Sequence, residues 1–175
     1  GYEELEEKVN ITKNDTLTYE LTPVTVEGVI NVSNVKKATI EVDGIIMKTT
    51  GKNGTTADVK LTPGRHTVDF SADGYKSQKK TFIIVNDPSR NNLSVELEAI
   101  TVSFTITVTN VRDAYIELDG KKIVATNSGK GTTTTQVLML GDYTVSVSAP
   151  GYIAQKEVIS VTEKGVKSQS FTLEL

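Results

Sequence analysis

One pattern occurs twice in this chain. A leucine, a glycine three residues later, an alternating stretch and a closing Gly-Tyr pair occupy residues 61–75 and again residues 138–152. The closing glycines, Gly74 and Gly151, lie 77 positions apart, and a third Gly-Tyr pair stands at residues 1–2. A repeat of this kind predicts tandem copies of one domain.

Each copy of the pattern reads as a strand between two turns. In the first copy Val68 and Phe70 alternate with Thr67 and Asp69, a period of two that is typical of a strand with one buried face. Glycine readily takes the positive φ that turns require. Glycines bound the strand in both copies: Gly64, Gly74, Gly141 and Gly151.

The composition favours strands throughout. Threonine and valine, both β-branched, are the most frequent of the 175 residues, and no long stretch has helical periodicity. The Asp-Gly pairs at residues 43–44 and 119–120 predict matching hairpins, with residues 45–50 as the return strand of the first. About seven short strands per copy indicate a β-sandwich. We therefore predict an all-β fold with two tandem immunoglobulin- or transthyretin-like β-sandwich domains, residues 23–99 and 100–175.

Residues 1–22 align with the end of a copy. Val9 and Ile11 follow Gly1 by the spacing at which two apolar residues follow Gly74 and Gly151. We aligned Leu17, Tyr19 and Leu21 with two later sets: Leu93, Val95 and Leu97, and Phe171, Leu173 and Leu175. This predicts the C-terminal strand pair of a preceding repeat, with a turn at residues 13–15, in a chain cut from a longer protein. Since an isolated hairpin is marginal in water, we expect the pair to dock on a sheet or to be poorly ordered.

Charge and cysteine content narrow the function. The net charge is −3 and the pI about 5.3, which argues against nucleic acid as a partner because its recognition needs a clustered basic face. The chain has no cysteine, so neither a disulfide nor thiolate chemistry is available. It also has no run of 18 apolar residues that could span a membrane.

Three patterns superficially suggest chemistry. Gly129-Lys130-Gly131 lacks the earlier glycine and following helix of a phosphate loop, so we interpret it as a hairpin loop. His66 is the only histidine, and its counterpart is Tyr143, which favours packing over catalysis. The acid pairs at residues 41–43 and 117–119 are interpreted as solvent-facing charge. We predict no catalytic, metal-binding or cofactor-binding residue and therefore no enzyme.

One residue is a candidate ligand contact. Tyr115 lies on the outward face of its predicted strand, where the first copy has Thr39, so the fold does not require it. Sugar-binding sandwiches use exposed aromatic platforms, and tryptophan is absent here. Tyr115 is thus the predicted contact if the chain binds carbohydrate.

The residues also carry a family resemblance. Ala-x-Ile-x-Val/Leu-Asp-Gly, Leu-x-x-Gly, the alternating strand and the Gly-Tyr turn together resemble the PEGA domain, in two divergent copies over residues 23–175. The tetrapeptide that names the family falls at residues 35–38 and 111–114, where only the final alanine matches. The resemblance implies a non-catalytic module of prokaryotic surface, secreted or sensor proteins.

A weaker resemblance concerns residues 148–152, which are similar to the end of collagen-adhesin B-type surface repeats. Those repeats carry a Lys–Asn isopeptide bond assisted by a buried glutamate. Here neither first strand contains lysine, and Val145 and Ser146 stand where the glutamate is expected. We therefore expect no isopeptide bond.

Together these observations predict a non-enzymatic extracellular or cell-surface spacer or interaction module of a prokaryotic protein. Its expected partners are other protein domains or a cell-surface polymer, and any membrane anchor would lie outside this chain. The alternative is a carbohydrate- or cell-wall-binding module that accompanies an enzyme or adhesin.

Overall fold

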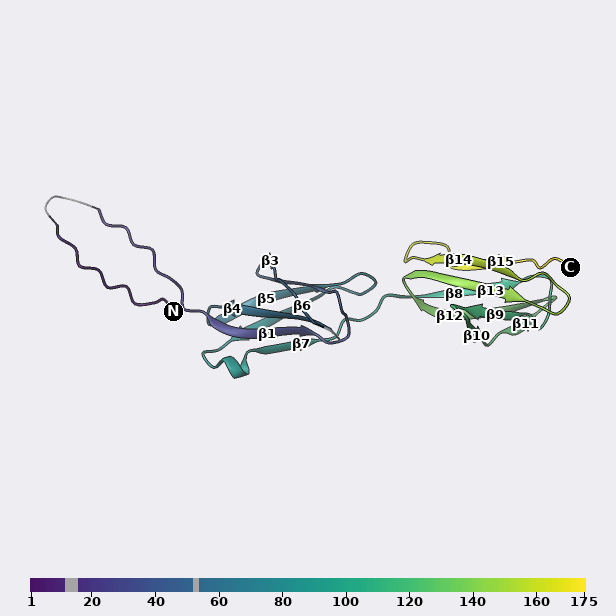
Figure 1. Ribbon diagram of the computed structural model, residues 1–175, viewed down its shortest axis with the longest axis horizontal. Coiled ribbons are helices and arrows are strands. Elements are labelled where there is room, and N and C mark those ends of the chain that lie inside the picture. Colours follow the sequence, from purple (N-terminus) through teal and green to yellow (C-terminus); the bar gives the residue numbers. More distant parts are fainter. Residues whose placement is uncertain (12–15, 52–53) are drawn as a thin grey trace. The chain divides into compact units, whose positions relative to one another are not determined.

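A computed structural model describes residues 1–11, 16–51 and 54–175 (Figure 1). The chain divides into two compact units, Gly1–Glu98 and Ala99–Leu175. Each unit has its own cluster of buried apolar side chains. The protein is all-β, as predicted, and each unit contains two sheets packed as a sandwich. Within the described residues, no helix has the length and apolar character needed to cross a membrane.

Unit 1 packs a three-stranded sheet, in the order β4-β1-β7, against a four-stranded sheet, in the order β3-β2-β5-β6. A short 3-10 helix, η1 (Pro88–Arg90), precedes β7. The strands are β1 (Val26–Val32), β2 (Thr39–Val42), β3 (Ile45–Ile46), β4 (Thr55–Leu61), β5 (Gly64–Ser71), β6 (Gln78–Ile84) and β7 (Asn92–Val95).

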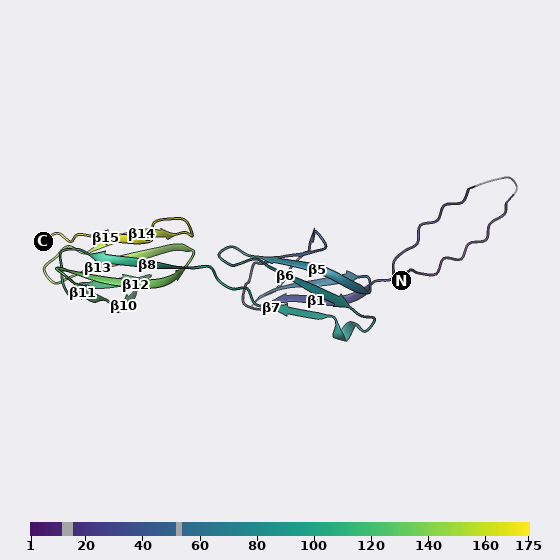
Figure 2. The same cartoon turned by 180° about the vertical axis from the view of Figure 1, so that it is seen from behind.

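Unit 2 repeats this arrangement with sheets in the order β11-β12-β8-β15 and β10-β9-β13-β14 (Figure 2). Strand β11 is the addition: among the described residues of unit 1, a single Thr50–Thr56 bridge stands at that place. The strands are β8 (Thr101–Val108), β9 (Tyr115–Leu118), β10 (Lys121–Ile123), β11 (Thr126–Ser128), β12 (Gly131–Met139), β13 (Gly141–Ser148), β14 (Gln155–Val161) and β15 (Ser168–Phe171).

The hairpin turns predicted at the two Asp-Gly pairs are present. Asp43 and Gly44 have φ of 48° and 86°, and Asp119 and Gly120 have φ of 49° and 77°. Positive φ at both central residues matches the right-handed twist of the flanking strands, which makes a tight hairpin. The closing Gly-Tyr turns are confirmed as well, since Tyr75 and Tyr152 pack against the two cores.

The return strand of the hairpin is shorter than predicted. We expected residues 45–50 to form it, but β3 ends at Ile46. Unit 2 shows why: there the same segment is divided into β10, which pairs with β9, and β11, which pairs with β12 of the opposite sheet. The backbone crosses between layers at this point, so one continuous strand cannot form.

The alignment of the last strand also requires correction. Val95 pairs with Val32, and Phe171 pairs with Val108, 76 positions further along in each case. Leu97 therefore corresponds to Leu173, and the predicted match of residues 93, 95 and 97 with 171, 173 and 175 was wrong by two residues. Leu175 is 89% exposed, whereas Leu173 is 3% exposed.

The described part of residues 1–22 is exposed throughout. One isolated β-bridge, Tyr2–Pro23, involves it, and none of its described residues belongs to a strand. The turn predicted at residues 13–15 lies outside the described residues. The assignment of this segment to a preceding repeat stays a prediction.

Candidate functional site

The first and last strands of each unit lie side by side and run parallel. In unit 1, β1 pairs with β7 from Val29–Asn92 to Val32–Val95. In unit 2, β8 pairs with β15 over the same four-residue length. Because the paired strands are parallel, the chain enters each unit at one end of this pairing and leaves at the other. We call the two pairings the terminal seams.

An asparagine side chain extends each terminal seam by one step. Asn34 Nδ2 donates to Leu97 O at 2.9 Å, and Leu97 N donates to Asn34 Oδ1 at 3.1 Å. Asn110 makes the same two bonds with Leu173, at 2.8 Å and 3.1 Å. The amide thus stands in for a backbone peptide of the first strand. It also holds Leu97 and Leu173 where their side chains enter the cores.

A buried threonine ties the next turn to each sandwich. Thr55, 1% exposed, accepts a hydrogen bond from Ala38 N at 2.8 Å and donates one to Val35 O at 2.7 Å. Thr132 makes the corresponding pair of bonds in unit 2. Both threonines satisfy backbone groups that would otherwise be buried without partners, which is costly.

The terminal seams lie between the first and last strands of each unit, so their geometry decides how a pulling force would load them. A force applied between the two chain ends of a unit acts along the parallel strands. It loads their hydrogen bonds together, in shear, instead of opening them one after another. A sheared ladder resists force better than a peeled one because several bonds must fail at once.

His66 is buried in unit 1, and both nitrogens of its ring make hydrogen bonds. Its Nε2 lies 2.8 Å from Thr62 O, and its Nδ1 lies 2.6 Å from Asp43 Oδ2. A carbonyl and an ionised carboxylate only accept hydrogen bonds, so both contacts are satisfied when the ring carries two protons. The cationic form of His66 therefore fits this site best.

The pKa directions agree with that geometry. Burial alone favours neutral His66, but the hydrogen bonds to Asp43 and to Thr62 O, with the nearby carboxylate charge, outweigh it and raise the pKa of His66. The hydrogen bond from His66, followed by one from Thr67 N, lowers the pKa of Asp43. The pair has no histidine or cysteine partner, and its contacts hold the hairpin turn to β5.

The acid pairs have an additional structural role. Asp43 Oδ1 accepts from Thr67 N at 2.8 Å, and Asp119 Oδ1 accepts from Thr144 N at the same distance. These aspartates thus tie the hairpin turn to the adjacent strand, so the interpretation as solvent-facing charge was incomplete. Within the described residues, no group of three or more histidine, cysteine or acidic side chains could hold a metal ion.

Close backbone packing explains the glycine at the end of the Gly129-Lys130-Gly131 loop. Gly131 begins β12, and a Cβ there would overlap Val108 O of the neighbouring strand; Gly54 is in the same situation against Val32 O. The loop joins β11 to β12 as a hairpin, and a strand follows it where a phosphate loop would need a helix.

The isopeptide chemistry needs lysine and glutamate in a core. In the described part of the chain, the buried polar side chains are Thr55, His66, Asn91, Thr132 and Thr134. Asn91 is fully buried, but its amide bonds to the backbone of Glu27 and Val85. It contacts no lysine through these bonds.

Tyr115 is 46% exposed and borders an open hollow beside β9 and β10. Lys122 Nζ lies 4.2 Å from the centre of its ring, within the range of a cation–π contact. Asn127 Nδ2 donates to Asp113 Oδ1 at 2.7 Å along the same hollow. The hollow therefore combines an aromatic face, a cation and an amide–carboxylate pair.

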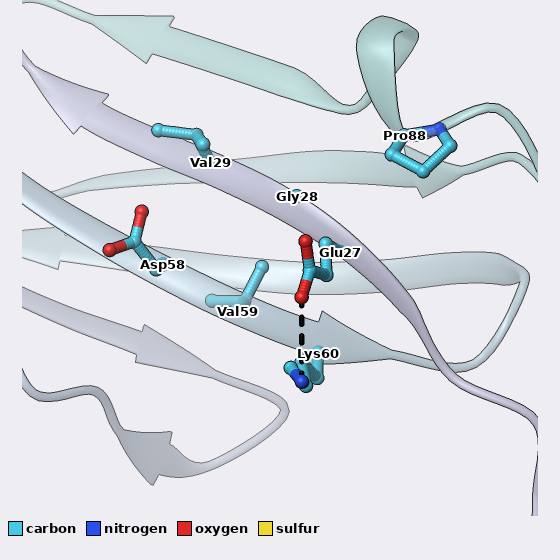
Figure 3. A pocket seen from close by; sticks show the side chains of 7 residues that line it. All are labelled: Glu27, Gly28, Val29, Asp58, Val59, Lys60 and Pro88. Atoms are coloured by element: carbon cyan, nitrogen blue, oxygen red, sulfur yellow. Dashed lines mark ion pairs between the residues drawn. The ribbon is translucent and has the colours of Figure 1, made fainter.

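A second hollow lies on the outer face of β1 and β4 (Figure 3). Its only ion pair joins Lys60 to Glu27 at 3.4 Å, and both side chains are more than 70% exposed. Asp58 lies apart from this pair in the view. An ion pair between two exposed side chains contributes little to stability. It is lined by Glu27, Gly28, Val29, Asp58, Val59, Lys60 and Pro88.

A family model matches part of this chain, and a solved structure has a similar fold. Residues 24–89 match the family model of the phage tail tube protein C-terminal domain. The Bacillus anthracis TIE protein has a similar fold, with a TM-score of 0.58 and 17% identity over 88% of this chain and 34% of that one. A D312A variant of BcpA, the major pilin subunit of Bacillus cereus, aligns over 86% of this chain and 59% of that one, with 11% identity and a TM-score of 0.29. No curated protein matches the sequence.

The matches bear on the fold alone. The chain spans about a third of the TIE protein, and the family match covers less than half of the chain. The β-sandwich part of the predicted resemblances is confirmed, whereas the assignment to the PEGA family stays a prediction. The Asn34 and Asn110 contacts were missed from the sequence, although both copies have asparagine at this position while the residues two and three places later differ.

Proposed function

We propose that this chain is a non-enzymatic spacer that carries mechanical tension in the extracellular part of a prokaryotic protein. The observation that supports it is the terminal seam, which is parallel in both units and extended by Asn34 in one and by Asn110 in the other. Chain ends at opposite ends of each seam suit a domain that is pulled from both sides.

Other features support the same role. The described buried polar groups serve the fold, and neither hollow gathers catalytic groups. The similarity to a tail tube domain and to the fold of the TIE protein is what a structural module would show. The proposed partners are neighbouring protein domains, with a cell-surface polymer as the alternative, and the proposed location is the cell surface.

Single-molecule stretching tests the proposal. Because the sequence contains no cysteine, engineered thiols are unique attachment points. Thr101→Cys with Leu175→Cys pulls the seam of unit 2 in shear. Arg112→Cys with Leu175→Cys grips the same end of both seam strands and peels them apart. We expect a several-fold higher unfolding force in the first geometry.

The contour length identifies the event being measured. Complete unfolding of unit 2 between residues 101 and 175 should release roughly 20–25 nm of chain. Asn110→Ala should lower the shear force and leave the peeling force nearly unchanged. Equal forces in the two geometries would refute a role in tension.

Tyr115 supports a second candidate, a carbohydrate- or cell-wall-binding module. Its exposed ring and the polar groups of Asp113, Lys122 and Asn127 could contact a sugar ring and its hydroxyls. A glycan array and retention on purified cell-wall polysaccharide separate this candidate from a plain spacer.

A further inference from the structure

The same backbone hydrogen bond occurs three times in the chain. Lys76 N donates to Glu98 O at 2.8 Å in unit 1, and Ile153 N donates to Glu174 O at 2.7 Å in unit 2. Both donors directly follow a Gly-Tyr pair, and both acceptors directly follow the last core leucine. Glu3 N donates to Thr22 O at 2.8 Å in the same way, after Gly1-Tyr2 and after Leu21.

In the two units, this bond closes the base of a strand pair whose members belong to different sheets. Strand β6 adds to the edge of β5, and β7 pairs in parallel with β1. The two strands face each other across the core and do not bond to each other as a ladder. The hydrogen bond is therefore a mark of the last two strands of a sandwich.

The described residues 1–11 and 16–22 have the form of such a pair. Figure 1 shows the segment as two extended arms, and no strand ladder joins their described residues. Leu5 and Glu7 from one arm and Tyr19 and Leu21 from the other line an open hollow between the arms.

The apolar residues of the first arm match buried positions. Val9 and Ile11 are 41% and 68% exposed. Their counterparts in the two units are all at most 5% exposed: Phe82, Ile84, Ile159 and Val161.

The apolar residues of the second arm also match buried positions when the corrected register is used. Tyr19 and Leu21 are 45% and 47% exposed. Their counterparts are at most 7% exposed: Val95, Leu97, Phe171 and Leu173. Leu17 corresponds to Leu93 and to Gln169, which are half-buried, so a polar residue is tolerated there.

We propose that the two arms, residues 1–11 and 16–22, belong to the last two strands of a further β-sandwich of this repeat type. Their partner is the remainder of such a sandwich, presenting counterparts of β1 and β5. The arm with Val9 and Ile11 adds to the edge of the β5-like strand. The arm with Tyr19 and Leu21 pairs in parallel with the β1-like strand. Neither unit of this chain is that partner, because β6, β7, β14 and β15 already occupy the corresponding places.

A transplant within the full-length chain tests the proposal. Residues 151–174 are replaced by a copy of residues 1–22, so that the arms take the places of β14 and β15. We expect unit 2 to fold, with the transplanted Val9 and Ile11 amides exchanging at least 100-fold more slowly than the same amides in the unaltered segment. Ile11→Ser and Leu21→Ser in the transplant should abolish this protection, whereas Leu17→Gln, which restores the residue of unit 2, should preserve it.

A second experiment tests the proposal in case the transplanted unit does not fold because the arms pack poorly against unit 2. A chain that ends at Gly151 lacks β14 and β15, and the unaltered 175-residue chain is added to it. We expect a complex on size-exclusion chromatography that Leu21→Ser in the donor prevents. The absence of both protection and complex overturns the proposal. Slow amide exchange of Val9 and Ile11 in the unaltered chain, with no other protein present, also overturns the proposal, because the arms would then already have a partner.

Discussion

His66 and Tyr143 occupy the same position in the two units, and each ring donates a hydrogen bond to the carbonyl oxygen four residues earlier. The bond is 2.8 Å from His66 Nε2 to Thr62 O and 3.0 Å from Tyr143 Oη to Met139 O. Only the histidine also contacts the hairpin aspartate, Asp43, through its second nitrogen. The same hydrogen bond to a carbonyl oxygen is thus made by an imidazole in unit 1 and by a phenol in unit 2.

This difference predicts that the stability of unit 1 depends on pH. The folded pKa of His66 is raised, so its contribution is fully present below about pH 6.5 and is lost as the pH rises through the folded pKa. The folded pKa of Asp43 is lowered, so its contribution is present above about pH 4 and is lost as the pH falls through that pKa. We expect unit 1 to be most stable between about pH 4 and 6.5, measured by calorimetry.

Reciprocal substitutions provide the control. His66→Tyr should remove the decline of unit 1 above pH 6.5. Tyr143→His should introduce a similar decline in unit 2, because Asp119 stands where Asp43 does. An unchanged pH profile in both variants would show that the His66–Asp43 contact does not stabilise the fold.

The asparagine contacts predict matched losses of stability in the two units. Asn34→Ala removes two partly exposed hydrogen bonds to Leu97, which should lower the free energy of unfolding of unit 1 by about 1–3 kcal/mol. Asn110→Ala should have the same effect on unit 2. Urea unfolding measures both, and Asn86→Ala, at an exposed position, should change stability by less than about 0.5 kcal/mol.

The buried hydroxyl of Thr55 predicts a larger loss of stability for Thr55→Val, which preserves side-chain volume, than for the same substitution at the next residue. Thr55→Val leaves Ala38 N and Val35 O without their partner in a buried site, at a cost of at least about 2 kcal/mol. Thr56→Val changes the next residue, whose hydroxyl bonds to the Asn31 side chain, and should cost less than about 1 kcal/mol. Similar unfolding midpoints for the two variants would contradict this.

The sandwiches were predictable because their signals are local. Alternation specifies which face of a strand is buried, and glycine or Asp-Gly marks a turn that needs positive φ. The same period explains the error at residues 171–175: a shift of two residues leaves every side chain on its predicted face. Only the parallel pairing of Phe171 with Val108 fixes the register.

The site features depend on contacts between side chains that alternation and turn residues do not specify. Asn34 and Leu97 are 63 residues apart and meet only because the last strand returns beside the first. Lys122 reaches Tyr115 because the β9–β10 hairpin sets Lys122 opposite Glu117. The sequence indicated that Tyr115 was exposed, and the structure adds that a cation lies by its ring.

That cation leads to a prediction for the sugar-binding candidate. An ammonium group over the ring of Tyr115 competes with a sugar for the same aromatic face. Lys122→Met should therefore strengthen retention on cell-wall polysaccharide if the ring is the platform, and Tyr115→Thr should abolish retention. The threonine variant reproduces Thr39 of the first copy, so the fold should tolerate it. Retention that is the same for the unaltered chain and both variants would remove Tyr115 as a contact and leave the spacer role without this alternative.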